Sequence, residues 1–243
     1  MAKEYKVDYY SIIGFVGFAL LTVFIWRFYY GYYILYPFTL LGTWFHEMGH
    51  GIMAMIVGGN FEYLEIFETG SGVAHSSFSS DDFYMSKKVS YALVSAAGLM
   101  GPPIMGSILI LMSKSFKKSK VILFILSISM ILSVMIWVRI TLGVVAISSL
   151  GLILLFIAFK GGKIFQQFVV QLIGIMACVS TYRQLDYLFM EKAVINGEEF
   201  ISDTGKIAEN LGMNYAFWGT LIAIISFVML VYSLYLRNRT LVS

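Results

Sequence analysis

The stretch FHEMGHG, residues 45–51, interrupts a segment that is otherwise apolar from Tyr32 to Val57. On a helix, His46 and His50 lie on one face about 5–6 Å apart, a spacing from which both imidazoles can bind one metal ion. Glu47 projects beside that ion, where a carboxylate can act as a base without being a ligand. The stretch therefore predicts a zinc site of the HExxH type on an apolar helix. The simpler alternative is a pair of buried histidines bonded to neighbouring helices.

The composition indicates that this helix lies in a membrane. The chain has 243 residues, of which 59% are hydrophobic and only 13% are charged, and its mean hydropathy is +0.81. These values are typical of an integral membrane protein. Segments of about twenty apolar residues, each able to cross a bilayer core of about 30 Å, recur along the chain. We expect an all-α polytopic bundle of about seven transmembrane helices, forming one membrane-embedded domain over residues 1–243. The expected spans lie near residues 9–27, 33–57, 88–113, 121–138, 140–159, 164–190 and 214–236.

Charged residues divide between the two sides that seven spans would create. One side receives Arg27, the lysines of residues 114–120 and the basic residues near the C-terminus, but no carboxylate. By the positive-inside rule that side is cytoplasmic, which places the N-terminus outside and the C-terminus inside. The sequence contains no phosphate-binding loop and no basic–aromatic surface, so we expect no nucleic-acid partner.

A catalytic zinc needs a third protein ligand, and three residues are candidates. Asp186 is preferred, because it and His50 are expected at matched depths, roughly 6–10 Å below the same surface. The alternative for Asp186 is an ion pair with Arg183 one turn earlier. Asp203, in ISDTGKIAENLG, fits better as a helix N-cap, and His75 lies in a loop. Both stay open as alternatives to Asp186.

Two further segments are expected to lie beside the zinc helix. Polar and apolar residues alternate on both sides of Thr69–Gly72, which predicts a short β-hairpin directly after the HExxH helix. The edge of such a hairpin could pair with an extended substrate by strand addition, or the hairpin could only cap the bundle. The segment AAGLMGPPIMG, residues 96–106, combines small residues with two prolines and is expected to pack closely against the zinc helix.

The sequence resembles the short B-type branch of the site-2 protease family of intramembrane zinc metalloproteases. The resemblance lies in four blocks over residues 44–222: FHEMGHGIMAMIVGG, VSAAGLMGPPIMGSIL, a helix ending in an aspartate, and SDTGKIAENLGMNYAFWG. It implies a zinc ion, hydrolysis of peptide bonds within the membrane, His46 and His50 as ligands and Glu47 as general base. It also implies an aspartate from a later span as the third ligand.

The sequence departs from the family pattern in three respects. Better-known members carry a Leu-Asp-Gly motif for the third ligand, preceded by an Asn and a Pro. Here Leu185 and Asp186 are followed by Tyr187, and the upstream Asn and Pro are missing, so the match is partial. No PDZ-like insert is present. The family architecture would also place the site nearer the cytosol than the charge distribution does, which leaves the orientation open.

These features together predict a zinc-dependent intramembrane endopeptidase in a multi-pass protein surrounded by membrane lipids. Its expected substrates are transmembrane or membrane-proximal segments of other proteins, cleaved in regulated intramembrane proteolysis. The alternative is a catalytically inactive, protease-like scaffold that binds membrane proteins. The intact Glu47 argues against this alternative, because a pure binding protein has no need of the base. A histidine-rich di-iron oxidase is excluded, because three histidines cannot supply its ligands.

Overall fold

A computed structural model describes residues 5–79, 84–195 and 197–241, and long helices dominate it. The two short helices, α7 (Leu185–Leu188) and α8 (Asp203–Leu211), both follow α6. The long helices are α1 (Tyr9–Trp26), α2 (Tyr29–Ile56), α3 (Lys87–Met112), α4 (Phe116–Ile136), α5 (Thr141–Lys160), α6 (Lys163–Arg183) and α9 (Tyr215–Asn238). The prediction of an all-α polytopic bundle is confirmed.

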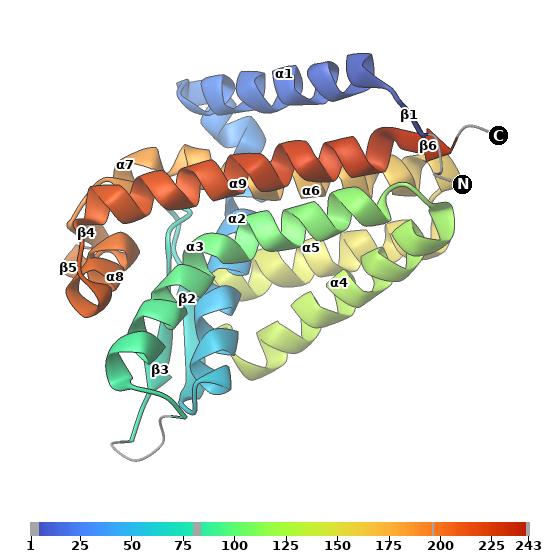
Figure 1. The fold of residues 1–243 in the computed structure, drawn as a ribbon. Helices are drawn as coiled ribbons and strands as arrows, with labels where there is room; N and C mark the ends of the chain where they lie inside the picture. The colour runs from blue at the N-terminus through green and yellow to red at the C-terminus, as the bar shows by residue number, and fades with distance from the viewer. Residues whose placement is uncertain (1–4, 80–83, 196, 242–243) are drawn as a thin grey trace.

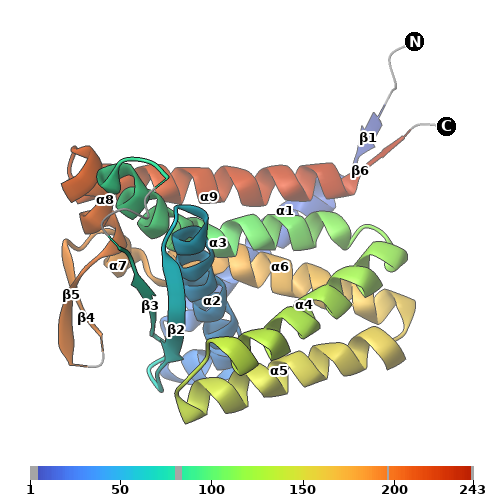
Figure 2. The same cartoon turned by 90° about the horizontal axis from the view of Figure 1, so that it is seen from below.

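Six of the described helices, all the long ones except α2, are long and apolar enough to cross a membrane. The protein is therefore a multi-pass integral membrane protein. Helix α2 is the longest described helix but contains no stretch as apolar as those of the other six, and it runs across the long axes of α4, α5 and α9 (Figures 1 and 2). Every residue from Thr39 to Phe45 is buried, so this helix is surrounded by protein over those two turns. A helix in that position can carry polar side chains that lipid would not tolerate.

The two ends of the chain lie together at one end of the bundle, called here the termini end (Figure 1). Strand β1 (Tyr5–Val7) pairs antiparallel with β6 (Arg239–Leu241). The expectation that the N- and C-termini lie on opposite sides is therefore wrong. The physical reason is that six apolar helices cross, and an even number of crossings returns the chain to its starting side.

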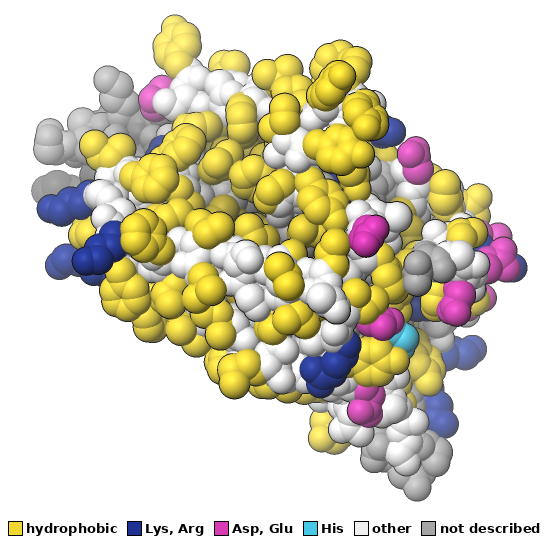
Figure 3. Space-filling model, turned by 180° about the vertical axis from the view of Figure 1, so that it is seen from behind, with side chains coloured by type: hydrophobic (Ala, Val, Ile, Leu, Met, Phe, Trp, Pro, Cys, Tyr) yellow, Lys and Arg dark blue, Asp and Glu magenta, His cyan; other side chains and the backbone are white. Residues whose placement is uncertain are grey.

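Basic residues gather at the termini end, where the α3–α4 and α5–α6 turns also lie. The Lys114 ammonium donates to the Leu236 carbonyl over 3.5 Å, which ties the α3–α4 turn to the end of α9. Lys163 lies over the Phe116 ring, 5.5 Å from its centroid. Figure 3 shows Lys and Arg side chains at both ends, most of the Asp and Glu side chains toward one of them, and a largely hydrophobic face in between. Arg27, however, pairs with Asp186 and so lies with the acidic residues, contrary to the sequence-based division.

The opposite end, called here the site end, is built from two β-hairpins with α7 and α8 (Figure 2). The first hairpin pairs β2 (Asn60–Ile66) with β3 (Gly72–Ser77), as predicted. The second pairs β4 (Lys192–Ile195) with β5 (Glu198–Ile201) and was not anticipated. The outer edge of β2 is occupied, because the Leu64 N–H donates to the Trp137 carbonyl and the Leu64 carbonyl accepts from the Arg139 N–H.

Glycines allow α2 and α3 to pack at very short range, which confirms that the small-residue segment lies against the HExxH helix. A Cβ atom at Gly49 would come within 2.3 Å of the Ala97 carbonyl oxygen, and one at Gly101 within 2.7 Å of the Phe45 carbonyl oxygen. On the other side of α2, the Trp44 indole donates to the Ser133 hydroxyl of α4 over 2.9 Å. The largest cluster of buried apolar side chains fills the space between α2, β2, α4, α5 and α6. These contacts fix the position of α2.

Candidate metal centre

The two histidines of α2 lie one helical turn apart and point the same way. Their Nε2 atoms are 3.0 Å apart, and their ring centroids are separated by 4.6 Å. The Nδ1 atom of His50 lies 2.8 Å from the Val94 carbonyl oxygen of α3, which can only accept a hydrogen bond. Nδ1 of His50 must therefore carry the proton, and its Nε2 lone pair is left for a metal ion.

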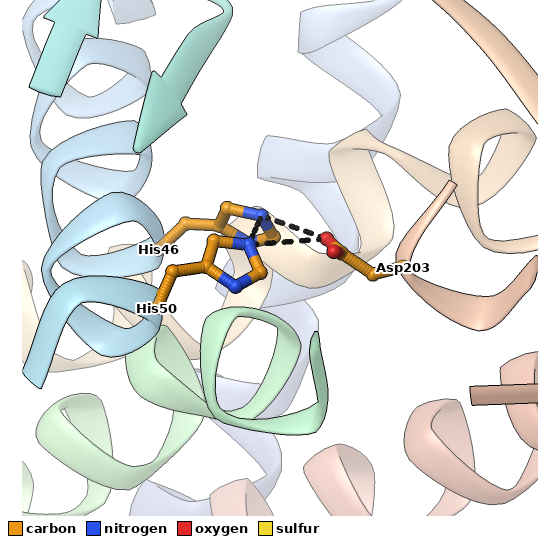
Figure 4. A group of neighbouring side chains, drawn as sticks. All are labelled: His46, His50 and Asp203. Carbon is orange, nitrogen blue, oxygen red and sulfur yellow. Dashed lines mark hydrogen bonds and ion pairs between the residues drawn. The ribbon is translucent and has the colours of Figure 1, made fainter. Parts of the chain in front are cut away.

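An aspartate from a distant segment completes the group (Figure 4). Asp203, the first residue of α8, places its Oδ2 atom 3.1 Å from the His46 Nε2 and 3.3 Å from the His50 Nε2. The neighbouring Ser202 caps α8, because its hydroxyl accepts a hydrogen bond from the Gly205 N–H over 3.0 Å. With the cap supplied by Ser202, the Asp203 carboxylate is left to face the histidines. The sequence-based reading of Asp203 as the N-cap is thus wrong by one residue.

The environment keeps the Asp203 carboxyl ionised although its side chain is only 3% exposed. Burial raises the pKa of this carboxyl, but the imidazoles of His50 and His46 lower it, and the net effect places the pKa well below its usual range. An ionised, buried carboxylate beside two imidazoles is a suitable ligand set for a divalent cation, which would displace the imidazole protons on binding.

Tyr187 is bonded twice to Asp203. Its hydroxyl donates to the Asp203 Oδ2 over 3.0 Å and accepts from the Asp203 backbone N–H over 3.2 Å. Burial is the main cause that raises the pKa of Tyr187 well above its usual value, so this hydroxyl stays protonated and remains a donor. Contacts of this kind fix the orientation of metal ligands in many proteins. Tyr187 replaces the glycine expected from the resemblance, and its role was not anticipated from the sequence.

The spacing of the three ligand atoms fits a zinc ion. A tetrahedral site with metal–ligand distances of about 2.0–2.1 Å has edges of about 3.3–3.4 Å. The separations of 3.0, 3.1 and 3.3 Å among His46, His50 and Asp203 approach those edges. Among the described residues, this is the group of three or more His, Cys, Asp or Glu side chains that could hold a metal ion. Two imidazoles and one carboxylate form a donor set of the catalytic type, which leaves a fourth position open.

Glu47 follows His46 on α2 and is 4% exposed. Its carboxylate interacts with both histidines, with Asp203 and with the backbone N–H of Ala74 in β3. Gly72 permits this approach, because a Cβ atom there would lie 2.8 Å from the Glu47 Cγ. The side chain therefore lies between the group formed by His46, His50 and Asp203, called here the metal-ligand group, and the inner edge of the β2–β3 hairpin.

The other two predicted ligand candidates do not join the histidines. Helix α6 ends at Arg183, and Asp186 follows on the single turn of α7, where its side chain is 73% exposed. Its Oδ2 lies 3.5 Å from the Arg27 guanidinium, so the expected pair with Arg183 is not formed either. His75 bonds to Glu65 within the β2–β3 hairpin, at 3.1 Å. A matched depth did not bring Asp186 to the site, because depth does not specify the direction in which a side chain points.

Most of the chain matches the model of one known protein family. The family described as Peptidase M50B-like matches residues 15–233, which include all seven long helices in whole or in part. The chain belongs to this family, the site-2 protease family. Its proteases are zinc-dependent membrane metalloproteases, and no PDZ domain is found in this chain. Neither a curated protein nor a solved structure matches the chain.

In this member of the family, the metal-ligand group opens onto a cleft of about 790 Å³ at the site end. Helix α2 forms its floor with Thr43, His46, Glu47 and His50. One wall is β3, the other is the β4–β5 hairpin with α8, and α3 and the end of α6 close the remaining sides. An extended peptide could enter between the two hairpins and reach the three ligand residues.

Proposed function

We propose that the chain is a zinc-dependent intramembrane endopeptidase in which His46, His50 and Asp203 hold the metal ion and Glu47 is the general base. The observation that carries this proposal is the convergence of the three ligand atoms within 3.0–3.3 Å, with Glu47 on the same helix and a cleft above them. Asp203 takes the place of Asp186 in this assignment, because Asp186 lies at the surface beside Arg27.

Zinc, when bound, would supply a Lewis acid that activates a water molecule and polarises a peptide carbonyl. The protein supplies the proton transfer. A Glu47 carboxylate oxygen takes the proton from the attacking water and delivers it to the leaving amide nitrogen. Burial of Glu47 in the floor of the cleft limits exchange of that proton with bulk water.

Strand β3 is suited to present an extended substrate. On the far side β2 pairs with residues 137–139, whereas β3 faces the cleft with Val73, Ala74 and Ser76 and has no further strand partner among the described residues. A substrate segment that adds to this edge would exchange its helical hydrogen bonds for ladder bonds, which exposes the peptide bond to attack. The proposed substrates are therefore transmembrane or membrane-proximal segments of other proteins that can unwind, as expected of regulated intramembrane proteolysis.

The test is cleavage of a model transmembrane peptide by the zinc-loaded, detergent-purified protein and by the Glu47→Gln variant. The amide is nearly the size of the carboxylate and should preserve zinc binding while it removes the base, so we expect cleavage to fall by about 10²–10⁴-fold. Equal cleavage by both proteins would refute the role of Glu47. Tight peptide binding with no cleavage by the wild type would instead support the inactive scaffold.

A further inference from the structure

Arg183, the last residue of α6, is a cation on the wall of the cleft without a counterion in the described part of the chain. Its Nε atom is buried and has no hydrogen-bond acceptor. The carboxylate nearest in sequence, Asp186, pairs with Arg27 instead. The carboxylates on the floor of the cleft are also engaged, since Asp203 faces His46 and His50.

A guanidinium without a counterion in this position carries a desolvation cost, because its Nε is shielded from water although the residue as a whole is half-buried. A buried charge without a partner destabilises a protein, and the penalty is greatest for ionisable groups close to the membrane interior. Arg183 could have pointed to the surface like Arg27, which is half-exposed, yet it lines the same cleft as the metal-ligand group. A ligand that brings an anionic group into the cleft would supply the missing partner.

The surroundings define where in the cleft this anion would lie. Tyr32 of α2 lies near Arg183. The Tyr32 hydroxyl donates to the Thr69 carbonyl in the turn that precedes β3, over 2.8 Å. Arg183 therefore lies toward the turn end of β3, to one side of the metal-ligand group. A strand lying along β3 would pass both groups.

We propose that Arg183 is a substrate-binding residue that receives a carboxylate of the peptide, at a fixed distance from the scissile bond. The inference rests on the proposed function insofar as the ligand is a peptide in the cleft. Guanidinium binds carboxylate through two parallel N–H···O bonds, a geometry that an ammonium group cannot reproduce. Two sources of the carboxylate share this chemistry: an acidic side chain on the substrate, or its free C-terminus.

The experiment measures binding, so that its outcome does not depend on activity. Fluorescent octapeptides with a single Glu or Gln at each successive position, each with a free or an amidated C-terminus, are titrated against the zinc-loaded Glu47→Gln protein in detergent. Fluorescence anisotropy reports the affinity. We expect about tenfold tighter binding of Glu than of Gln at one position, or a similar loss on amidation, since a charge-assisted pair is formed. The first result identifies a side-chain carboxylate, and the second a C-terminal one.

Two variants in the same background test whether Arg183 causes the preference. Arg183→Gln should abolish it, and Arg183→Glu should reverse it, so that Gln binds more tightly than Glu at the same position, while zinc content stays unchanged. Lys206→Gln is the matched control, because Lys206 is the other described cation that lines the cleft; this variant should retain the preference.

Equal binding of Glu, Gln and amidated peptides would overturn the proposal. So would a preference that survives in Arg183→Gln, or one that Lys206→Gln removes to the same extent. Cleavage is measured separately with Glu47 intact. Absent cleavage with an Arg183-dependent preference would refute the protease but retain the carboxylate site, and the reverse pattern would refute only the carboxylate site.

Discussion

Asp186 and Asp203 both belong to the segment that connects α6 to α9, yet the fold uses them in opposite ways. Asp186 lies on one turn of helix at the surface, with its side chain 73% exposed and its partner Arg27 half-exposed. Asp203 is buried and accepts hydrogen bonds or ion-pair contacts from two histidines and a tyrosine. The difference arises from local structure: Ser202 caps α8 and leaves the adjacent carboxylate unused, whereas no capping residue positions Asp186. Here the residue next to the cap, and not the cap itself, faces the histidines.

The largest difference should appear between two single variants, Asp203→Ala and Asp186→Ala. Asp203→Ala removes a proposed ligand and should lower cleavage of a model transmembrane peptide by more than about a hundredfold, because losing a residue that only supports a ligand already costs about 10–100-fold. Asp186→Ala removes an exposed ion pair, worth about 0–1 kcal/mol, and should change cleavage by less than about twofold. A large loss in the Asp186 variant alone would reverse the comparison.

The next effect concerns the packing of α3 against His50. A Cβ atom at Gly98 would come within 2.1 Å of the His50 Nε2, so Gly98→Ala should displace the imidazole. We expect zinc affinity, measured by competition with a chelator, to fall by about a hundredfold, because one of three ligands moves. Gly14→Ala is the matched control, since a Cβ atom there meets nothing within 4 Å. Unchanged affinity in Gly98→Ala would show that the histidine pair is not the binding site.

Tyr187→Phe should have a smaller effect on the same measurement. The variant keeps the ring and removes only the hydroxyl that bonds to Asp203, so zinc affinity should fall by about 10–100-fold. Tyr182→Phe is a fair control, because the Tyr182 hydroxyl bonds to the Ala223 carbonyl on α9, outside the metal-ligand group. Equal losses in both variants would indicate a general loss of stability instead of a role in orienting Asp203.

The smallest effect is expected from Ser202→Ala. Loss of a helix N-cap costs about 0.5–2 kcal/mol, so the midpoint of thermal unfolding should fall while zinc is retained under excess metal. If added zinc restores the stability of this variant, the metal must hold Asp203 in place when the cap is lost, which would distinguish Asp203 further from Asp186. Wild-type stability in this variant would contradict the capping role.

The sequence predicted the fold class and the helix that carries His46, Glu47 and His50, but not the aspartate that faces them. Apolar runs and the turn at Thr69–Gly72 are local signals, so the long helices and the first hairpin could be located in advance. The spacing of His46, Glu47 and His50 is also local, and all three lie where the spacing places them. The number of crossings was overestimated because α2 is long enough to span a bilayer, although no stretch of it is as apolar as those of the other long helices.

The third ligand depends on information that the periodicity of a sequence does not contain. Asp203 reaches the histidines because α8 folds back across the end of the bundle, and hydropathy does not specify that path. One signal was nevertheless available. Ser202 and Asp203 are adjacent, and only one of them can cap α8, so the second polar residue was free for another role. The partial match of Leu185, Asp186 and Tyr187 to the family motif was a second signal, because it weakened the case for Asp186 as the third ligand.

The central claim is that His46, His50 and Asp203 form one zinc site. The most direct test is the zinc content of the detergent-purified wild type, Asp203→Ala and Asp186→Ala proteins, measured by elemental mass spectrometry. We predict about one zinc per chain in the wild type and in Asp186→Ala, and a near-complete loss in Asp203→Ala. Zinc retained by Asp203→Ala and lost from Asp186→Ala would contradict the assignment.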